Sequence, residues 1–246
     1  AVLARGETIL ENAAIEPEID DLIGLLNQMG AQVVRTDATT IHITGVEKLS
    51  GCEFSIMPDR NEAVTFAIAA YITRGDITVT HARQNDLTAF LKVLDQSGAG
   101  YEIIDDDTIR FFYKGPLMAT DVETQVHPGF MTDWQAPWAV LMTQATGVST
   151  IHETIFENRF SYVEELKKLG AKIEYFNPKV ENPKELYSFN WEDNKDEYYH
   201  AIRITGPSAL HNGILTMTDL RAGATLVLGA LAASGTSELC GVDMID

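Results

Sequence analysis

The chain has 246 residues, of which 45% are hydrophobic and 22% charged, a composition typical of folded globular proteins rather than disordered or fibrous ones. Its 18 basic and 36 acidic residues give a net charge of −18, which disfavours nucleic-acid partners because such a surface repels phosphates. No apolar run reaches the roughly 20 residues that cross a bilayer, and no signal pattern opens the chain. We therefore expect no membrane partner and a cytoplasmic location.

A pattern of about 70 residues repeats along the chain, which indicates a fold built from repeated units. In each copy one glycine precedes an expected strand and a second glycine follows an expected helix. The first kind comprises Gly6, Gly75 and Gly147, and the second kind Gly30, Gly98 and Gly170. A fourth copy starts near Ala233.

The first two copies carry the same predicted elements in the same order. Apolar residues at i, i+3, i+4 and i+7 predict amphipathic helices, and short apolar stretches around polar turns predict strand pairs. The helices are expected over 19–29 and 87–94, and the strand pairs over 31–34 with 40–44 and over 101–104 with 108–113. The third copy, 145–175, begins in the same way.

The third copy differs by an insertion over 177–197, where the other copies have a short turn. This segment is acidic and rich in Tyr, Phe and Trp, and its two Asn-Pro steps predict a loop. We expect a mobile excursion on the outer side of the sheet. Its removal should then leave stability nearly unchanged, because loop-closure entropy grows slowly with length.

Each unit also has a second helix that is apolar nearly all round and is headed by an aspartate: Asp59, Asp133 or Asp219. Such helices are buried, and an aspartate at the start is a plausible N-cap. A single unit cannot hide its apolar helix, so several units must pack these helices together beneath an outer wall of sheet. The predicted fold class is therefore α/β (α+β), an inside-out α/β barrel of repeated units.

Four polar clusters lie at strand ends or helix starts, where side chains and backbone amides can converge on a ligand. They are Pro58–Arg60, His127–Asp133, Phe156–Phe160 and Thr218–Arg221. Taken singly, each aspartate is more often a cap than a catalyst, and each arginine more often part of a surface ion pair. His127, next to proline, is more often structural. What favours a functional interpretation is the recurrence of these clusters at equivalent edges of successive repeats.

The chemistry that these clusters suit is proton removal beside anion binding. A lone carboxylate can take the proton of a substrate hydroxyl while arginines stabilise phosphate or carboxylate charge. The sequence has no nucleotide-binding glycine motif, no metal-ligand spacing and no serine-hydrolase or kinase motif. Cys52 and Cys240 stand far apart, so we expect buried thiols rather than a disulfide or a zinc site. We expect neither a metal nor an organic cofactor.

Five sequence segments, four of which contain these clusters, resemble the enolpyruvyl transferases, and among them the UDP-N-acetylglucosamine 1-carboxyvinyltransferases. They are ENAAIEPEIDDLIGLLNQMGA, MPDRNEA, HPGFMTDWQA, FENRFSYVEELKKLGA and MTDLRAGATLVLGALAASG. FENRF and TDLRA separate this branch from the shikimate-pathway enolpyruvyl transferase, which shares the repeats. The resemblance implies transfer of enolpyruvyl from phosphoenolpyruvate to the 3′-hydroxyl of UDP-N-acetylglucosamine with release of phosphate, the first committed step of peptidoglycan synthesis.

The resemblance also implies roles for individual residues. Asp133 matches the aspartate that binds the sugar hydroxyl and is proposed as its general base, and Ile155 matches a position that contacts the nucleotide. Asp219 and Arg221 match residues tied to turnover of the intermediate and to domain closure. Arg60 and Arg159 are further candidates for substrate binding.

The family has two inside-out barrels with the active site between them. By resemblance, residues 1–56 are the last repeat portion of the first, cysteine-loop domain, and residues 57–246 most of the second domain. The family's reactive cysteine and its Lys-Asn pair have no match here, and neither Cys52 nor Cys240 takes that role. Met131 stands where the family has proline. We therefore expect a fragment without the N-terminal part and the extreme C-terminus, inactive alone, whose partner is the missing portion of its own full-length chain.

Two alternatives remain open at this stage. One is an enolpyruvyl transferase with another acceptor such as shikimate 3-phosphate, which the insertion would favour if it lay across the nucleotide site. The other is a non-catalytic repeat scaffold whose acidic surface binds a basic partner.

Overall fold

The structure, a computed structural model, describes residues 1–217 and 220–242, and of residues 220–222 the backbone alone. Two compact units make up the chain, residues 1–58 and residues 59–246. Each unit is described separately below. None of the helices in the described ranges combines the length and the apolar character needed to span a membrane.

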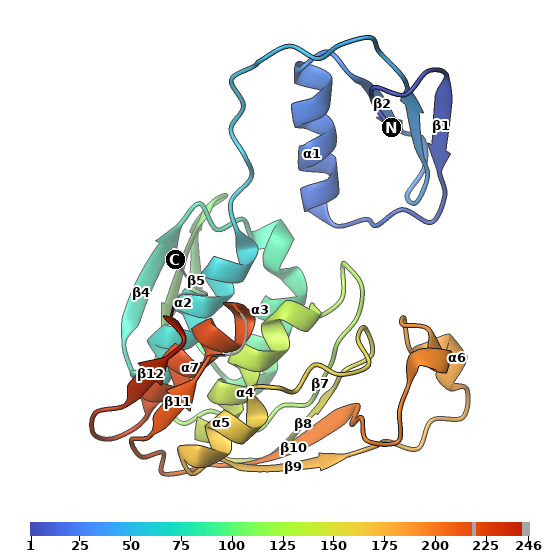
Figure 1. The fold of residues 1–246 in the computed structure, drawn as a ribbon. Coiled ribbons are helices and arrows are strands. Elements are labelled where there is room, and N and C mark those ends of the chain that lie inside the picture. Colours follow the sequence, from blue (N-terminus) through green and yellow to red (C-terminus); the bar gives the residue numbers. More distant parts are fainter. Residues whose placement is uncertain (218–219, 243–246) are drawn as a thin grey trace. The chain divides into compact units, whose positions relative to one another are not determined.

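The smaller unit is one copy of the repeat (Figure 1). Its elements are β1 (Glu7–Leu10), α1 (Pro17–Gln28), β2 (Gln32–Arg35) and β3 (Ile41–Thr44), and its antiparallel sheet has the order β1-β3-β2. Helix α1 starts at a proline, whose missing N–H has no partner in a first turn anyway. Its apolar face, with Ile19, Ile23 and Leu26, packs on the buried side of the sheet around Val33 and Ile43.

The larger unit contains two further copies with the same topology. The first has β4 (Asp76–Thr80), the 3₁₀ turn Gln84–Leu87, α3 (Thr88–Ser97), β5 (Gly100–Asp105) and β6 (Thr108–Phe112). The second has β8 (Gly147–His152), α5 (Val163–Lys168), β9 (Lys172–Phe176) and β10 (Ala201–Gly206). Their sheet orders, β4-β6-β5 and β8-β10-β9, repeat that of the smaller unit. The repeat predicted from the glycine spacing is therefore confirmed.

Two parallel strand pairs link successive copies. Strand β7 (Val122–Glu123) lies parallel to β8, and β11 (Ile214–Thr216) lies parallel to β12 (Glu238–Cys240). In both pairs a largely buried helix connects the two strands, which is the usual way to join parallel neighbours.

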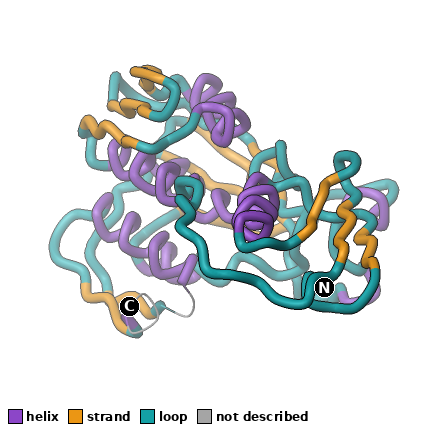
Figure 2. The backbone as a smooth tube through the Cα atoms, turned by 90° about the horizontal axis from the view of Figure 1, so that it is seen from above, coloured by secondary structure: helices purple, strands orange, loops and turns teal. Residues whose placement is uncertain are grey.

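Three apolar helices form the core of the larger unit, α2 (Arg60–Ile72), α4 (Gln135–Gln144) and α7 (Leu220–Ala232). They contact one another and lie side by side, with the sheets toward the outside (Figures 1 and 2). Helix α4 buries nine of its ten residues. This arrangement confirms the predicted α/β class, with apolar helices inside and sheets outside.

The insertion after β9 has short elements of its own and is largely exposed. It contains the short helix α6 (Pro183–Leu186) and the 3₁₀ turn Trp191–Asp193, at the end of the sheet that holds β9 and β10 (Figure 1). The Tyr187 side chain is only 5% exposed, and its ring stacks on that of Trp191 with centroids 5.0 Å apart. Tyr187 thus attaches a largely exposed insertion to the sheet end, and the expected mobility of the segment stays a prediction.

The two cysteines differ from expectation. Cys52 is exposed and Cys240 is half-buried, and both are free thiols.

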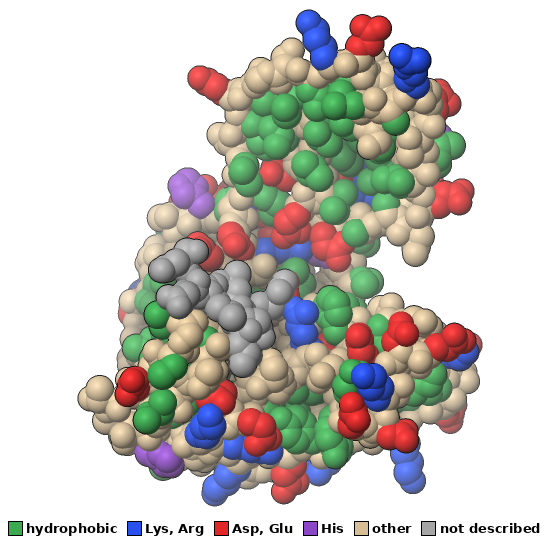
Figure 3. All heavy atoms as spheres, viewed as in Figure 1, with side chains coloured by type: hydrophobic (Ala, Val, Ile, Leu, Met, Phe, Trp, Pro, Cys, Tyr) green, Lys and Arg blue, Asp and Glu red, His purple; other side chains and the backbone are tan. Residues whose placement is uncertain are grey.

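Acidic side chains are scattered over the face drawn in Figure 3, in keeping with the net charge of −18.

Candidate functional site

The N-terminal ends of α2 and α4 lie next to each other in the larger unit. The Trp134 indole Nε1 donates to the Asn61 side-chain oxygen at 2.9 Å, which joins the two helix starts. Asp59 caps α2 as predicted, because its carboxylate accepts from the backbone N–H groups of Asn61 and Glu62 at 2.7 and 3.3 Å. Helix starts carry partial positive charge, so this end of the unit favours anions.

Asp133 occupies the 3₁₀ turn Thr132–Trp134 that leads into α4, but it does not cap the helix. Its Oδ1 instead accepts from Arg159 Nη2 at 2.6 Å, with side chains 20% and 21% exposed. The neighbouring Trp134 is buried in a cluster of edge-to-face rings with Phe90 and Phe130. That packing fixes the turn and leaves Asp133 at the partly open surface.

The second part of the site is the irregular segment that follows β8. Arg159 is held here between two partners, the Asp133 carboxylate and the Phe156 ring, whose centroid lies 4.4 Å from the guanidinium carbon. Ile155 is half-buried in the same segment. Arg159 does form an ion pair, but its partner lies 26 residues away and both side chains are mostly buried.

Arg60, the first residue of α2, is 3% exposed and is no surface residue either. Its Nη1 lies 3.1 Å from His127 Nδ1, and its guanidinium carbon lies 5.9 Å from the centroid of the Trp134 ring. The two nitrogens can share a hydrogen bond in which the guanidinium donates to a neutral imidazole. The structure thereby joins two of the predicted polar clusters, 67 residues apart.

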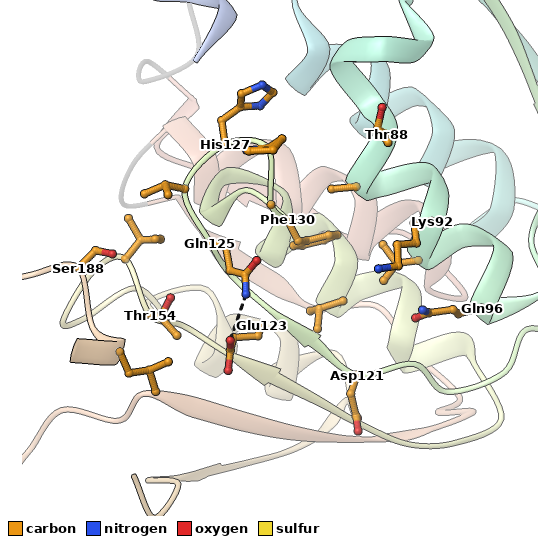
Figure 4. A pocket seen from close by; sticks show the side chains of 18 residues that line it. Thr88, Lys92, Gln96, Asp121, Glu123, Gln125, His127, Phe130, Thr154 and Ser188 are labelled. Atoms are coloured by element: carbon orange, nitrogen blue, oxygen red, sulfur yellow. Dashed lines mark hydrogen bonds between the residues drawn. The ribbon is translucent and has the colours of Figure 1, made fainter. Parts of the chain in front are cut away.

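Two hollows adjoin these residues. One has a volume of about 430 Å³ and is lined by Asp59, Asn61, Glu62 and Asp133 among others. The other, of about 830 Å³, lies between α3 and the loop after β7. Lys92 and Gln96 enter it from α3, and Glu123 and Gln125 from the opposite side (Figure 4). His127, Thr154 and Ile155 line it too, together with Leu186 and Ser188 of the insertion.

The structure thus brings some of the predicted site residues together and leaves others undescribed. Asp133 contacts Arg159, Arg60 contacts His127, and Ile155 shares a hollow with His127. Asp219 lies outside the described residues, and for Arg221 only the backbone is described. In the described ranges no group of three or more His, Cys, Asp or Glu side chains is arranged to hold a metal ion.

Glu153, directly after β8, was missed in the sequence. Its carboxylate is 1% exposed and binds both segments of the site. The one signal that could have revealed it is a charged residue at the end of a strand that is otherwise buried.

Chemically, the site pairs one partly open carboxylate with guanidinium groups at the positive ends of buried helices. A carboxylate that is ionised at neutral pH can accept a proton from a bound hydroxyl. Guanidinium groups and helix starts can stabilise phosphate or carboxylate charge nearby. Proton removal from a hydroxyl beside a bound anion is therefore chemistry that these groups can support.

The fold identifies the class of protein. The enolpyruvyl transferase NikO from Streptomyces tendae superposes with a TM-score of 0.79 at 24% identity, over 99% of this chain and 53% of that protein. The EPSP synthase of Acinetobacter baumannii does so with a TM-score of 0.67 at 20% identity, over 99% of this chain and 54% of that protein. The structure accordingly has the enolpyruvyl transferase fold.

The family follows from the sequence match. Residues 1–246 match the family model described as EPSP synthase (3-phosphoshikimate 1-carboxyvinyltransferase), and the chain belongs to this family. Among curated relatives, the UDP-N-acetylglucosamine 1-carboxyvinyltransferase of Finegoldia magna is 41% identical and that of Acidobacterium capsulatum 42% identical, each over 100% of this chain. The chain covers 53% and 51% of those two proteins, about half of their length.

Proposed function

We propose that the whole protein of which this chain forms a part is a UDP-N-acetylglucosamine 1-carboxyvinyltransferase. It transfers enolpyruvyl from phosphoenolpyruvate to the 3′-hydroxyl of UDP-N-acetylglucosamine and releases phosphate, in peptidoglycan synthesis in the cytoplasm. The observation that carries the proposal is the Asp133–Arg159 pair at the start of a buried helix, in a chain about 40% identical to relatives with this name. The reaction as proposed needs no metal or organic cofactor.

In this proposal Asp133 is the general base that takes the proton of the acceptor hydroxyl. Arg159 orients the carboxylate through the 2.6 Å contact and keeps a positive charge beside it. Ile155 contacts the nucleotide from the segment after β8. Arg60, Asp219 and Arg221 act on the anionic substrate or intermediate and on closure. Residues 1–56 belong to the first domain and 57–246 to the second, and the reactive cysteine and the phosphoenolpyruvate-binding pair come from the rest of the protein.

A second candidate is an enolpyruvyl transferase that acts on a different acceptor. The observation behind it is the insertion, because Leu186 and Ser188 line the larger hollow beside Ile155. A wall at that place would narrow the range of acceptors without changing the transfer itself. The identity of about 40% to the UDP-N-acetylglucosamine branch favours the first candidate.

Binding of the acceptor to this chain separates the two candidates. ¹⁵N-labelled chain should be titrated with UDP-N-acetylglucosamine, with UDP alone and with shikimate 3-phosphate, while the backbone amide signals are followed. The first candidate predicts weak, saturable shifts around Ile155 and Asp133 with the nucleotide sugar. Shifts at these residues with shikimate 3-phosphate alone would favour the second candidate. Shifts with none of the three ligands would count against an acceptor site beside Ile155 in either candidate.

A further inference from the structure

Glu153 is a buried carboxylate that the proposed reaction does not use. It follows β8 directly, and it is 1% exposed although its side chain carries a full charge when ionised. Burial of an isolated carboxylate is very unfavourable, so such a group needs strong hydrogen bonds.

The carboxylate accepts four hydrogen bonds, two on each oxygen. Oε2 accepts from the Thr132 hydroxyl at 2.7 Å and from Gln135 Nε2 at 3.1 Å. Oε1 accepts from the backbone N–H groups of Ile155 at 2.7 Å and Phe156 at 3.1 Å. Burial raises the pKa of Glu153, and the bonds from Thr132 and the two amides oppose that rise.

The two oxygens serve the two segments of the site separately. Thr132 and Gln135 lie on either side of Asp133 in the turn into α4. Ile155 and Phe156 belong to the segment that continues to Arg159. Gln135 adds a second link, because its Nε2 lies 3.5 Å from the Arg159 carbonyl oxygen and its Oε1 accepts from the buried Tyr162 hydroxyl at 3.0 Å. One carboxylate therefore sets the distance between the Asp133 turn and the Arg159 segment.

We propose that Glu153 is a positioning residue, which holds Asp133 and the Ile155–Arg159 segment in register for the acceptor. The structural half of this inference stands on the four hydrogen bonds. The catalytic half rests on the proposed function. Shifts of about 1 Å in catalytic geometry can cost around 10²-fold in rate, so loss of this link should appear in turnover and not only in folding.

The first experiment uses this chain and needs no activity. Glu153→Ala removes both accepting oxygens, so the Ile155 and Phe156 amides lose their side-chain acceptor. Glu153→Gln is less decisive, because its one oxygen can still accept from both amides. In Glu153→Ala, amide hydrogen exchange, followed by NMR, should become at least tenfold faster at Ile155 and Phe156, with altered signals at Asp133 and at the Arg159 side chain. The matched control is Glu165→Ala, because the Glu165 carboxylate also accepts from a backbone amide, the Thr216 N–H of β11 at 3.0 Å. It should leave the site signals unchanged.

If Glu153→Ala does not fold, variants of the donor Thr132 provide the test. Thr132→Val removes the hydroxyl that donates to Glu153 and keeps the shape, whereas Thr132→Ser keeps the hydroxyl. The proposal predicts that Thr132→Val changes the Ile155 and Phe156 amides across the shared carboxylate and that Thr132→Ser restores them. Folded Glu153→Ala or Thr132→Val protein with unchanged exchange at these amides would overturn the structural half.

The second experiment uses the whole protein with phosphoenolpyruvate and UDP-N-acetylglucosamine. Thr132→Val should lower kcat per folded molecule by about 10²-fold, and Thr132→Ser should recover most of it. A purely structural role would lower the folded fraction and leave kcat per folded molecule equal in both variants, which would overturn the catalytic half. Inactive wild-type protein would refute the proposed function instead, and the amide exchange would still test the structural link.

Discussion

Asp59 and Asp133, two aspartates predicted as helix caps, have different roles. Asp59 uses its carboxylate on two backbone amides of α2, whereas Asp133 uses its carboxylate on Arg159. The sequence around them is similar, yet the turn Thr132–Trp134 places Asp133 before the helix start and turns its side chain elsewhere. A cap and a candidate base are therefore told apart by their partners.

Replacement of Asp59 should reveal its role as a helix cap. Asp59→Ala removes a true cap and should lower the free energy of unfolding by about 0.5–2 kcal/mol. Chemical denaturation of the chain measures this loss, and Asp59→Asn, which can still accept the amide bonds, is the matched control. Equal stability of wild type and Asp59→Ala would contradict the capping role.

The residue scale also marks the limits of sequence reasoning about the site. The candidates Asp133, Arg159 and Arg60 could be found because they recur at the same place in successive repeats. Their partners could not, because Arg60 meets His127 across 67 residues and Arg159 meets Asp133 across 26. Pairing over such distances depends on how the helices and loops pack, which no local pattern encodes.

The helices and strands of the repeat were predicted well, whereas the ring contacts that attach the insertion were not predicted. Helix, strand and turn patterns are local and periodic, so three copies reinforced one another. The insertion has no counterpart in the other copies, and its stability comes from ring contacts between Tyr187, Trp191 and His200. The His152 imidazole adds a polar contact, since its Nε2 lies 3.1 Å from the Tyr187 hydroxyl oxygen.

Truncation of Tyr187 should therefore destabilise the chain. Tyr187→Ala removes a buried ring and should cost about 3 kcal/mol, in the range known for large aromatic truncations. Tyr187→Phe keeps the ring and loses only the contact with His152, so about 1 kcal/mol is expected. Thermal or urea unfolding provides the comparison, with Tyr199→Ala as a control at a side chain that is 45% exposed. A negligible effect of Tyr187→Ala would show that the ring does not anchor the insertion and would support the expected mobile loop.

His200, which packs against the rings of the insertion, should also make stability depend on pH near neutrality. Burial lowers the pKa of His200 below its ordinary value of 6.5, the His152 charge lowers it further, and Glu157 opposes them. Below pH 6.5 the unfolded chain binds a proton at His200 that the folded chain resists. The stability that neutral His200 contributes is thus fully present above pH 6.5, and it is lost as the pH falls through the lowered pKa of the folded state.

Urea unfolding between pH 8 and pH 5 measures this effect as a difference between proteins. The stability of wild type relative to His200→Phe should decline as the pH falls from about 6.5, the unperturbed histidine value. Parallel curves for the two proteins would show that His200 titrates alike in both states.

The fold of the whole molecule was predictable because a single unit cannot bury its own apolar helix. Several units must therefore pack these helices together. Helices α2, α4 and α7 cover one another's apolar surfaces, and α4 is buried almost completely. The activity is a different matter. The chain spans about half the length of its curated relatives, so a complete active site calls for residues that those proteins carry elsewhere.

The chain by itself should accordingly release no phosphate from phosphoenolpyruvate and UDP-N-acetylglucosamine. A base without the opposing acid and phosphate-binding groups leaves the developing charge unstabilised. A phosphate assay with the purified chain tests this, and robust turnover that Asp133→Ala abolishes would contradict it.

Phosphate release by the whole protein carrying Asp133→Asn tests whether Asp133 is the base of the proposed enolpyruvyl transferase. Asparagine keeps the shape and one accepting oxygen but cannot take a proton. The expected result is a 10²- to 10⁴-fold loss of kcat, the usual cost of losing general-base assistance. UDP-N-acetylglucosamine affinity and the unfolding midpoint should change little in the same samples. Wild-type turnover by folded Asp133→Asn protein would contradict the assignment.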